Sequence, residues 1–305
     1  MKIKTFIISA ITLFISLYLI IGYHSLKHID KNRIDVSKYI TLVDEVSENK
    51  VQVNWKYVVS IIAVENKNKI KNISDDKIKN ISDDKIKNTA NLFIEKSDNG
   101  YKLNSLDNVL NKLNFTDKEK ERVNDYIDQL KYFGLTPYRL KEDSKYTKFI
   151  EEIKDEAIKN YKEYKILPSI TIAQAILESS WGESDLAQIY NNLFGIKADS
   201  SWKGEYVTLE TFEFYDTKIE DKFRVYSNKN QSIKDHAKFL VDNQRYKKYG
   251  VFEAKTYIEQ AYALQNAGYS TAEDNSGQKR YAKDLIELIR QYNLQLIDSE
   301  IKISD

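Results

Sequence analysis

Ala173-Gln-Ala-Ile-Leu-Glu-Ser-Ser-Trp-Gly182 is the stretch of sequence that decides the fold. From Pro168 to Gly182 only one side chain can carry a charge, and it belongs to Glu178. The residues around Glu178 are apolar on nearly every side of a helical projection, which is typical of a buried helix. Proline suits the first turn of a helix, and glycine suits its end. The sequence therefore predicts a buried helix with Glu178 close to its C-terminus.

A carboxylate at the end of a buried helix is costly. Burial disfavours the charged form of Glu178, and the negative end of the helix dipole acts in the same direction, so both effects raise its pKa. A glutamate that stays protonated near neutral pH can serve as a general acid. A buried glutamate paired with an arginine or a lysine is the alternative, and these residues alone favour neither reading.

Five stretches, taken in their order along the chain, resemble a family of bacterial cell-wall hydrolases. They are residues 172–182, 190–197, 202–204, 223–226 and 267–271, the last followed by Tyr281-Ala282. The family is the N-acetylglucosaminidase family, glycoside hydrolase family 73, and the resemblance covers residues 146–294. It implies a lysozyme-like catalytic domain of the α+β class, mostly helical and with a β-hairpin. It also implies an endo-β-N-acetylglucosaminidase that cuts the glycan strands of peptidoglycan.

The resemblance assigns catalytic roles to three residues. Glu178 would be the general acid, and Tyr269 would be the tyrosine that the family places in its cleft. A second acidic residue would lie on the hairpin within a Thr-x-Glu triplet. The triplets that end at Glu210 and at Glu213 compete, and we assign Glu213 because its spacing fits the family better. The turn that follows is shorter than in the family and lacks its usual glycine.

Four residues in or near the same stretches are candidates for binding the sugar chain: Trp202, Tyr190, Asn192 and Tyr246. An aromatic ring such as that of Trp202 suits the apolar face of a pyranose, although the same ring could pack within the hairpin. Asn192 could fix the backbone of its loop rather than touch sugar.

The resemblance is compatible with two mechanisms. Glu213 could activate a water molecule on the opposite face of the sugar, or the 2-acetamido group of the substrate could attack with Tyr269 steadying it. A muramidase or a lytic transglycosylase on the same fold is the nearest rival. A catalytically silent peptidoglycan-binding scaffold belongs to another class, and the presence of Glu178, Tyr269 and a candidate second acid argues against it.

Composition excludes several other functions. The chain has 305 residues, enough for two domains, and its 47 basic and 46 acidic residues balance, which gives no indication of a nucleic-acid partner. It has no cysteine, and its three histidines (His24, His28 and His236) form no metal-ligand cluster. We therefore expect neither a metal nor a cofactor.

Residues 5–23 carry no charge and are mostly isoleucine, leucine and phenylalanine. About 19 helical residues cross a hydrocarbon core of ~30 Å, and no small-residue cleavage pattern follows. This predicts a single-pass signal anchor over residues 1–23. Lysines precede the segment, and lysines and an arginine follow it, so the charges do not determine the orientation of the anchor in the membrane. We place the catalytic domain outside the bacterial membrane, at the cell wall, because the expected substrate lies there.

The remaining segments complete the expected organisation. Residues 24–45 are interpreted as a polar stalk, and residues 46–136 as a small helical module that could bind a protein partner. Ile70-Lys-Asn-Ile-Ser-Asp-Asp-Lys77 recurs over residues 78–85, which indicates a local duplication. In the catalytic domain, residues 147–165 are predicted to form an amphipathic helix and residues 205–226 a β-hairpin.

Overall fold

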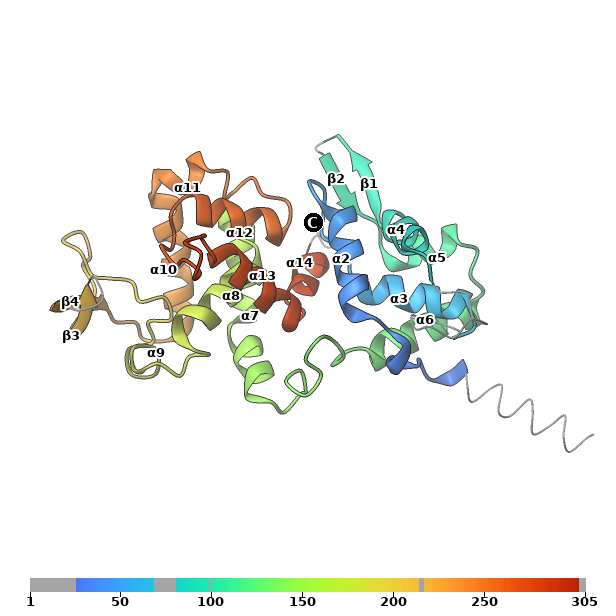
Figure 1. Cartoon of the computed structure of the whole chain (residues 1–305), viewed down its shortest axis with the longest axis horizontal. Helices are drawn as coiled ribbons and strands as arrows, with labels where there is room; N and C mark the ends of the chain where they lie inside the picture. The colour runs from blue at the N-terminus through green and yellow to red at the C-terminus, as the bar shows by residue number, and fades with distance from the viewer. Residues whose placement is uncertain (1–25, 69–80, 99, 214–216, 302–305) are drawn as a thin grey trace, which may run out of the picture. The chain divides into compact units, whose positions relative to one another are not determined.

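The computed structural model describes residues 26–68, 81–98, 100–213 and 217–301, with the side chains of residues 211–218 left out (Figure 1). The chain divides into two compact units. The first comprises Met1–Val46, Asn54–Glu95 and Asn104–Phe133, and the second comprises Ser47–Val53, Lys96–Leu103 and Gly134–Asp305. The predicted membrane segment and the first copy of the repeat lie outside the described residues.

The first unit is built around helix α3 (Trp55–Glu65), whose residues from Val58 to Val64 are all buried. Helices α4 (Asp83–Asn91) and α6 (Asp117–Gln129) pack against it. The other elements of this part of the chain are η1 (Lys31–Arg33), α2 (Val36–Ser47), β1 (Ile94–Ser97), β2 (Gly100–Leu103) and α5 (Leu106–Lys112). Most of the described residues between 46 and 136 are helical, but residues 47–53 and 96–103 belong to the second unit.

The stalk predicted over residues 24–45 needs correction. Residues 36–47 form helix α2, in which Tyr39, Ile40 and Val43 are almost fully buried. These apolar residues recur at spacings of three and four, so they line one face of the helix and pack into the first unit. Charged residues lie on both sides of this apolar run, several before Tyr39 and two after Val43, and they made the segment resemble a stalk.

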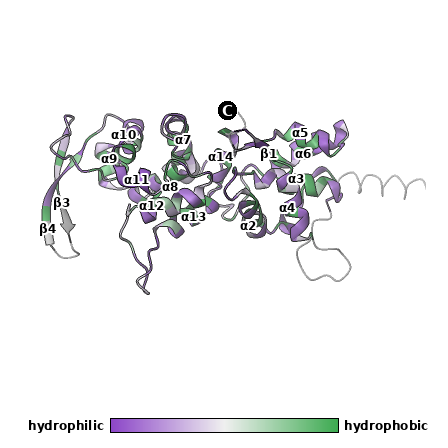
Figure 2. Cartoon of the chain, turned by 90° about the horizontal axis from the view of Figure 1, so that it is seen from above, coloured by the Kyte–Doolittle hydropathy of each residue, from purple (hydrophilic) through white to green (hydrophobic). Residues whose placement is uncertain are grey.

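The second unit is built around helix α8 (Pro168–Ser179), the buried helix predicted from the sequence. Helices α7 (Lys145–Tyr164), α12 (Tyr257–Asn266), α13 (Tyr281–Gln291) and α14 (Gln295–Ile301) all pack against it. The predicted amphipathic helix is α7, and it buries Phe149, Ile153 and Ala157. Most helices carry hydrophilic and hydrophobic sides in Figure 2, as expected for elements that surround a core.

The remaining elements of the second unit are α9 (Asp185–Tyr190), β3 (Tyr206–Glu213), β4 (Thr217–Arg224), α10 (Lys229–Asp242) and α11 (Gln244–Lys248). The predicted β-hairpin is formed by β3 and β4, which pair in antiparallel register from Tyr206 opposite Arg224 to Glu213 opposite Thr217. Figure 1 shows this hairpin extending from the helical part of its unit. The described chain is thus mostly helical with two small antiparallel sheets, in agreement with the predicted α+β class.

Helix α8 is held at its N-terminus by side chains from other helices. The backbone N–H of Ser169 donates to Asp298 Oδ1 at 3.0 Å, and the Ser169 hydroxyl donates to Oδ2 at 2.5 Å. Gln260 Oε1 accepts from the backbone N–H of Leu167 at 2.7 Å. The first N–H groups of a helix lack partners within it, and a carboxylate suits the positive end of its dipole. Asp298 and Gln260 therefore fix where the helix begins.

The C-terminus of α8 falls slightly before the predicted glycine. The helix ends at Ser179, Ser180 adopts a left-handed conformation with φ of 50°, and Gly182 follows with φ of 72°. The Ser179 hydroxyl oxygen accepts from the N–H of Gly182 at 2.7 Å. A Cβ on Gly182 would lie 2.7 Å from the ring of Phe149, so glycine is required here for space as well as for conformation.

No helix within the described ranges combines the length and the hydropathy that crossing a bilayer requires. The anchor predicted over residues 5–23 lies outside those ranges.

Replacing Asp298 by alanine should lower the free energy of unfolding by about 1–3 kcal/mol, because it leaves the buried N–H and hydroxyl of Ser169 without their hydrogen-bond partner. Urea titration with an unchanged m-value would measure the loss. Glu300→Ala, an exposed acidic residue of the same helix, is the matched control and should change stability by less than about 0.5 kcal/mol. Equal effects of the two variants would contradict the role given to Asp298.

Candidate active site

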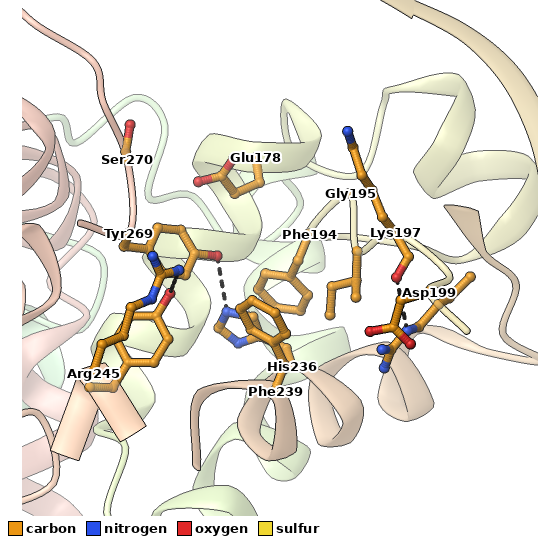
Figure 3. Close-up of a pocket in the computed structure, with 13 residues that line it drawn as sticks. Glu178, Phe194, Gly195, Lys197, Asp199, His236, Phe239, Arg245, Tyr269 and Ser270 are labelled. Atoms are coloured by element: carbon orange, nitrogen blue, oxygen red, sulfur yellow. Dashed lines mark hydrogen bonds between the residues drawn. The ribbon is translucent and has the colours of Figure 1, made fainter. Parts of the chain in front are cut away.

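A pocket of about 430 Å³ opens beside the C-terminal end of α8 (Figure 3). Its walls come from α8, the loop after α9, the end of β4, α10, α11 and the segment after α12. The lining residues are Glu178, Phe194, Gly195, Ile196, Lys197, Asp199, Arg224, His236, Phe239, Arg245, Tyr246, Tyr269 and Ser270.

Glu178 faces this pocket from the last turn of α8. Its surface is open to the pocket, yet the surrounding protein removes much of the water that would solvate a carboxylate. This burial raises the pKa of Glu178, and the hydroxyl of Tyr281, which donates to Oε1 at 3.4 Å, offsets part of the effect. In the described structure no arginine or lysine pairs with Glu178. The surroundings of Glu178 therefore favour its protonated form more than water would, and the ion-pair alternative does not apply.

Two tyrosines connect Glu178 to the interior. Gln174 Nε2 donates to the Tyr281 oxygen at 2.9 Å, which leaves the hydrogen of Tyr281 directed to Glu178. The ring of Tyr269 stacks on that of Tyr281, with centroids 5.1 Å apart and planes at 21°. The Tyr269 oxygen lies 3.0 Å from Nε2 of His236. Tyr269, predicted for the cleft, is thus beside the carboxyl group.

His236 is buried and neutral. Its ring stacks on that of Phe194 at a centroid distance of 3.8 Å, and burial lowers its pKa to about 3. Nδ1 has no hydrogen-bond partner in the described structure. A hydrogen on Nδ1 would therefore be a buried unpaired donor, whereas a hydrogen on Nε2 can bond to the Tyr269 oxygen. We assign the Nε2–H tautomer on this ground, and Tyr269 then accepts from His236 and has its own hydrogen to donate.

Three basic side chains line the pocket, and sequence reasoning missed all of them as site residues. Lys197 pairs with Asp221 at 2.5 Å, and Arg224 pairs with Asp235 at 2.8 Å. Arg245 donates instead to the Tyr246 hydroxyl at 2.6 Å and to the Gly268 carbonyl at 3.3 Å. Lys197 and Arg224 lie within stretches that carried the family resemblance, and Arg245 directly precedes Tyr246, a predicted sugar-binding residue; these were the available signals.

The structure brings some of the predicted sugar-binding residues to the pocket and not others. Tyr246 lines it from α11. Trp202 is not among the lining residues; its Nε1 donates to the Glu205 carbonyl at 2.9 Å, and its ring lies 4.4 Å from the Arg224 guanidinium. Tyr190 ends α9, and its carbonyl accepts from the N–H of Tyr226 at 3.0 Å.

Asn192, also predicted as a candidate for binding sugar, does not line the pocket. The side chain is buried, with 1% of its surface exposed. Its amide nitrogen donates to the carbonyls of Ile196 and Arg224, and its oxygen accepts from the N–H of Ile196 at 3.0 Å. Asn192 thus ties the loop that carries Phe194 and Lys197 to the end of β4.

The second acidic residue remains a prediction. Glu213 is the last residue of β3 and pairs with Thr217, and its side chain is outside the described part of the structure. Glu210, the alternative, lies opposite Glu220 in the same ladder. Within the described residues no group of three or more acidic residues or histidines is arranged to hold a metal ion.

Comparison with known proteins identifies the second unit. Residues 154–294 match the family described as mannosyl-glycoprotein endo-beta-N-acetylglucosaminidase. The chain is 44% identical over 156 residues to exo-glucosaminidase LytG of Bacillus subtilis (strain 168), which covers 49% of this chain and 52% of LytG. It is 43% identical over 104 residues to peptidoglycan hydrolase FlgJ of Vibrio parahaemolyticus, which covers 32% of this chain and 34% of FlgJ. The chain therefore spans about half or less of these curated relatives.

Among solved structures, the catalytic domain of the autolysin Auto from Listeria monocytogenes matches with 33% identity and a TM-score of 0.44. The match covers 60% of this chain and 98% of that domain.

Replacing Tyr281 by phenylalanine should raise the pKa of Glu178. The Tyr281 hydroxyl donates to the carboxylate and so favours its charged form, and its removal leaves desolvation unopposed. A titration of the Glu178 carboxyl carbon by NMR would measure the shift. Tyr292→Phe is the matched control, because that hydroxyl bonds to Arg139 and should leave Glu178 unchanged. A fall in the pKa of Glu178, or no change, would count against this hydrogen bond.

Proposed function

We propose that this chain, which belongs to the glucosaminidase family through residues 154–294, hydrolyses the glycan strands of peptidoglycan. We further propose that it acts as an endo-β-N-acetylglucosaminidase, cutting the β-1,4 bond between N-acetylglucosamine and N-acetylmuramic acid. The observation that carries the proposal is the position of Glu178. It is a carboxyl group with a raised pKa, on a pocket wall, beside a tyrosine with a hydrogen to donate.

The proposed role of Glu178 is to protonate the leaving oxygen. Glycoside hydrolysis passes through an oxocarbenium-like transition state, and the departing sugar needs a proton as the bond breaks. A carboxyl group can supply that proton at neutral pH only if its pKa is raised. Desolvation supplies the rise here, since no neighbouring carboxylate contributes to the shift.

The second half of the reaction has two possible routes. Glu213, at the end of β3, would activate a water on the opposite face and invert the configuration of the sugar. Alternatively, the acetamido oxygen of the substrate would attack the sugar carbon, and the hydroxyl of Tyr269 would hold that group by a hydrogen bond. The second route draws support from the tautomer assigned to His236, which leaves the hydrogen of Tyr269 available.

The N-terminal part of the chain would determine where the enzyme acts. We propose that residues 5–23 anchor it in the bacterial membrane with the second unit at the cell wall, because that uncharged run is long enough to span a bilayer. The first unit would serve as a spacer or bind a protein partner. Fractionation of cells should place the full chain with membranes and a chain lacking residues 1–25 elsewhere. Equal partitioning of both would refute the anchor.

Glu178→Gln should abolish hydrolysis while the protein remains folded. The amide keeps the volume of the side chain and removes the acidic proton, and loss of a general acid typically costs about 10²–10⁴ in rate. The measurement is mass spectrometry of peptidoglycan that has been digested and then reduced with borohydride. Wild-type digests should contain reduced N-acetylglucosamine ends. Near-wild-type turnover of the variant would show that Glu178 is not the acid.

The same assay separates the rival activities. Reduced muramic ends would indicate a muramidase, and anhydro-muramic ends a transglycosylase, with the fold unchanged. A folded wild-type protein that binds the sacculus and yields no new ends would indicate a binding protein.

Glu213→Gln should strongly reduce hydrolysis if Glu213 activates water, because the amide cannot accept the proton. Glu210→Gln is the matched control on the same strand and should retain activity. A Glu213→Gln variant with near-wild-type turnover would favour attack by the acetamido group or a transglycosylase, neither of which needs that base.

A further inference from the structure

Arg245 differs from the other cations of the pocket in its partners. Lys197 and Arg224 both pair with aspartates. Arg245 bonds to a hydroxyl and to a backbone carbonyl, and no carboxylate pairs with it in the part of the chain that the structure describes. Glu178, which shares the pocket, accepts a hydrogen bond from Tyr281 and forms no ion pair with Arg245 in the described structure. The pocket therefore contains a positive charge that the protein does not neutralise.

The guanidinium of Arg245 is also held in place. It lies 4.7 Å from the centre of the Tyr246 ring, and Tyr246 is fully buried and so fixes that ring. One terminal nitrogen donates to the Tyr246 hydroxyl and the other to the Gly268 carbonyl. Arginine carries five N–H donors, so these two bonds leave others unused. A guanidinium whose position is already restricted by such bonds loses less entropy on binding an anion than an unrestrained one does.

The position of Arg245 identifies which part of the pocket would receive that anion. Figure 3 shows Arg245 beside Tyr269 and Ser270, whereas Lys197 and Asp199 lie on the opposite side of the pocket. An N-acetylglucosamine residue held between Glu178 and Tyr269 would therefore leave Arg245 close to an N-acetylmuramic acid residue bonded to it.

We propose that Arg245 binds a carboxylate carried by the substituent on O3 of an N-acetylmuramic acid residue, and so selects muramic-acid glycans over neutral ones. This inference rests on the proposed function. The glycan of peptidoglycan alternates a neutral sugar with one that bears a lactyl group. In a peptide-free strand the lactyl carboxylate is itself the anion, and in a peptide-bearing strand the anion is a carboxylate of the peptide. Arginine suits both, because its fork of donors matches a carboxylate in two-point contact.

The test is equilibrium binding in the Glu178→Gln background, so that the glycan is not consumed. Three probes are compared: a tetrasaccharide of N-acetylglucosamine alone, a peptide-free tetrasaccharide that alternates N-acetylglucosamine and N-acetylmuramic acid, and the same tetrasaccharide with its peptides. Adding Arg245→Gln should weaken binding of an anionic probe by about ten- to a hundredfold, the usual worth of a charge-assisted hydrogen bond, and leave the neutral probe unchanged. Arg245→Lys should restore part of the loss, and raising the salt concentration should reduce the preference for anionic probes.

The control is Lys248→Gln, which removes an exposed positive charge from the same short helix outside the pocket lining. It should leave all three affinities unchanged. A loss with Arg245→Gln on the peptide-free probe identifies the lactyl carboxylate, and a loss confined to the peptide-bearing probe identifies the peptide. Equal losses on the neutral and anionic probes would overturn the proposal and make Arg245 a structural residue, as would unchanged affinity for all three. If the parent protein binds none of the glycans, the proposed function itself fails.

Discussion

The burial of helix α8 is the constraint on which the rest of the second unit depends. A helix that is apolar on almost every side must be covered on almost every side, and four other helices pack against it. The single ionisable residue of this helix lies where that cover opens into the pocket. The same packing that stabilises the core thus removes water from Glu178 and raises its pKa. Fold and candidate chemistry follow from one arrangement of helices.

Polar side chains within the unit convert this packing into a defined geometry. Asp298 and Gln260 satisfy the N-terminal end of α8, and Asn192 ties the pocket loop to the hairpin. Asn160 of α7 donates to the carbonyl of Ile233 in α10 at 2.9 Å and so links α7 to a helix that lines the pocket. Apolar contacts alone tolerate small displacements of one helix against another, whereas the loss of a buried hydrogen bond costs free energy. Such bonds therefore fix the relative positions of the elements around the pocket.

The sequence was most informative where the relevant interactions are local. The helix that carries Glu178, the amphipathic α7 and the β3–β4 hairpin all followed from periodicity and from residue types within one segment. Burial of α2 was missed because charged residues flank its apolar run on both sides. The sequence offered two roles for Asn192, which were fixing the backbone of its loop and contacting sugar. The sequence could not decide between these roles, because the hydrogen-bond partners of Asn192, Ile196 and Arg224, belong to different elements.

The cations of the pocket were missed for a related reason. A sequence shows that Arg245 precedes a tyrosine, but not that the tyrosine is buried and that no carboxylate approaches. In the folded protein the positive charge of Arg245 is kept apart from Glu178. This separation is consistent with the proposed roles of Arg245 in binding an anion and of Glu178 as the general acid. Arg245 lowers the pKa of Tyr269, against the larger effect of burial, whereas only desolvation and Tyr281 account for the shift at Glu178. A cation closer to Glu178 would favour its carboxylate and weaken it as an acid. By stacking on Tyr246, Arg245 stays on the tyrosine side, where it can attract an anionic sugar without deprotonating the proposed acid.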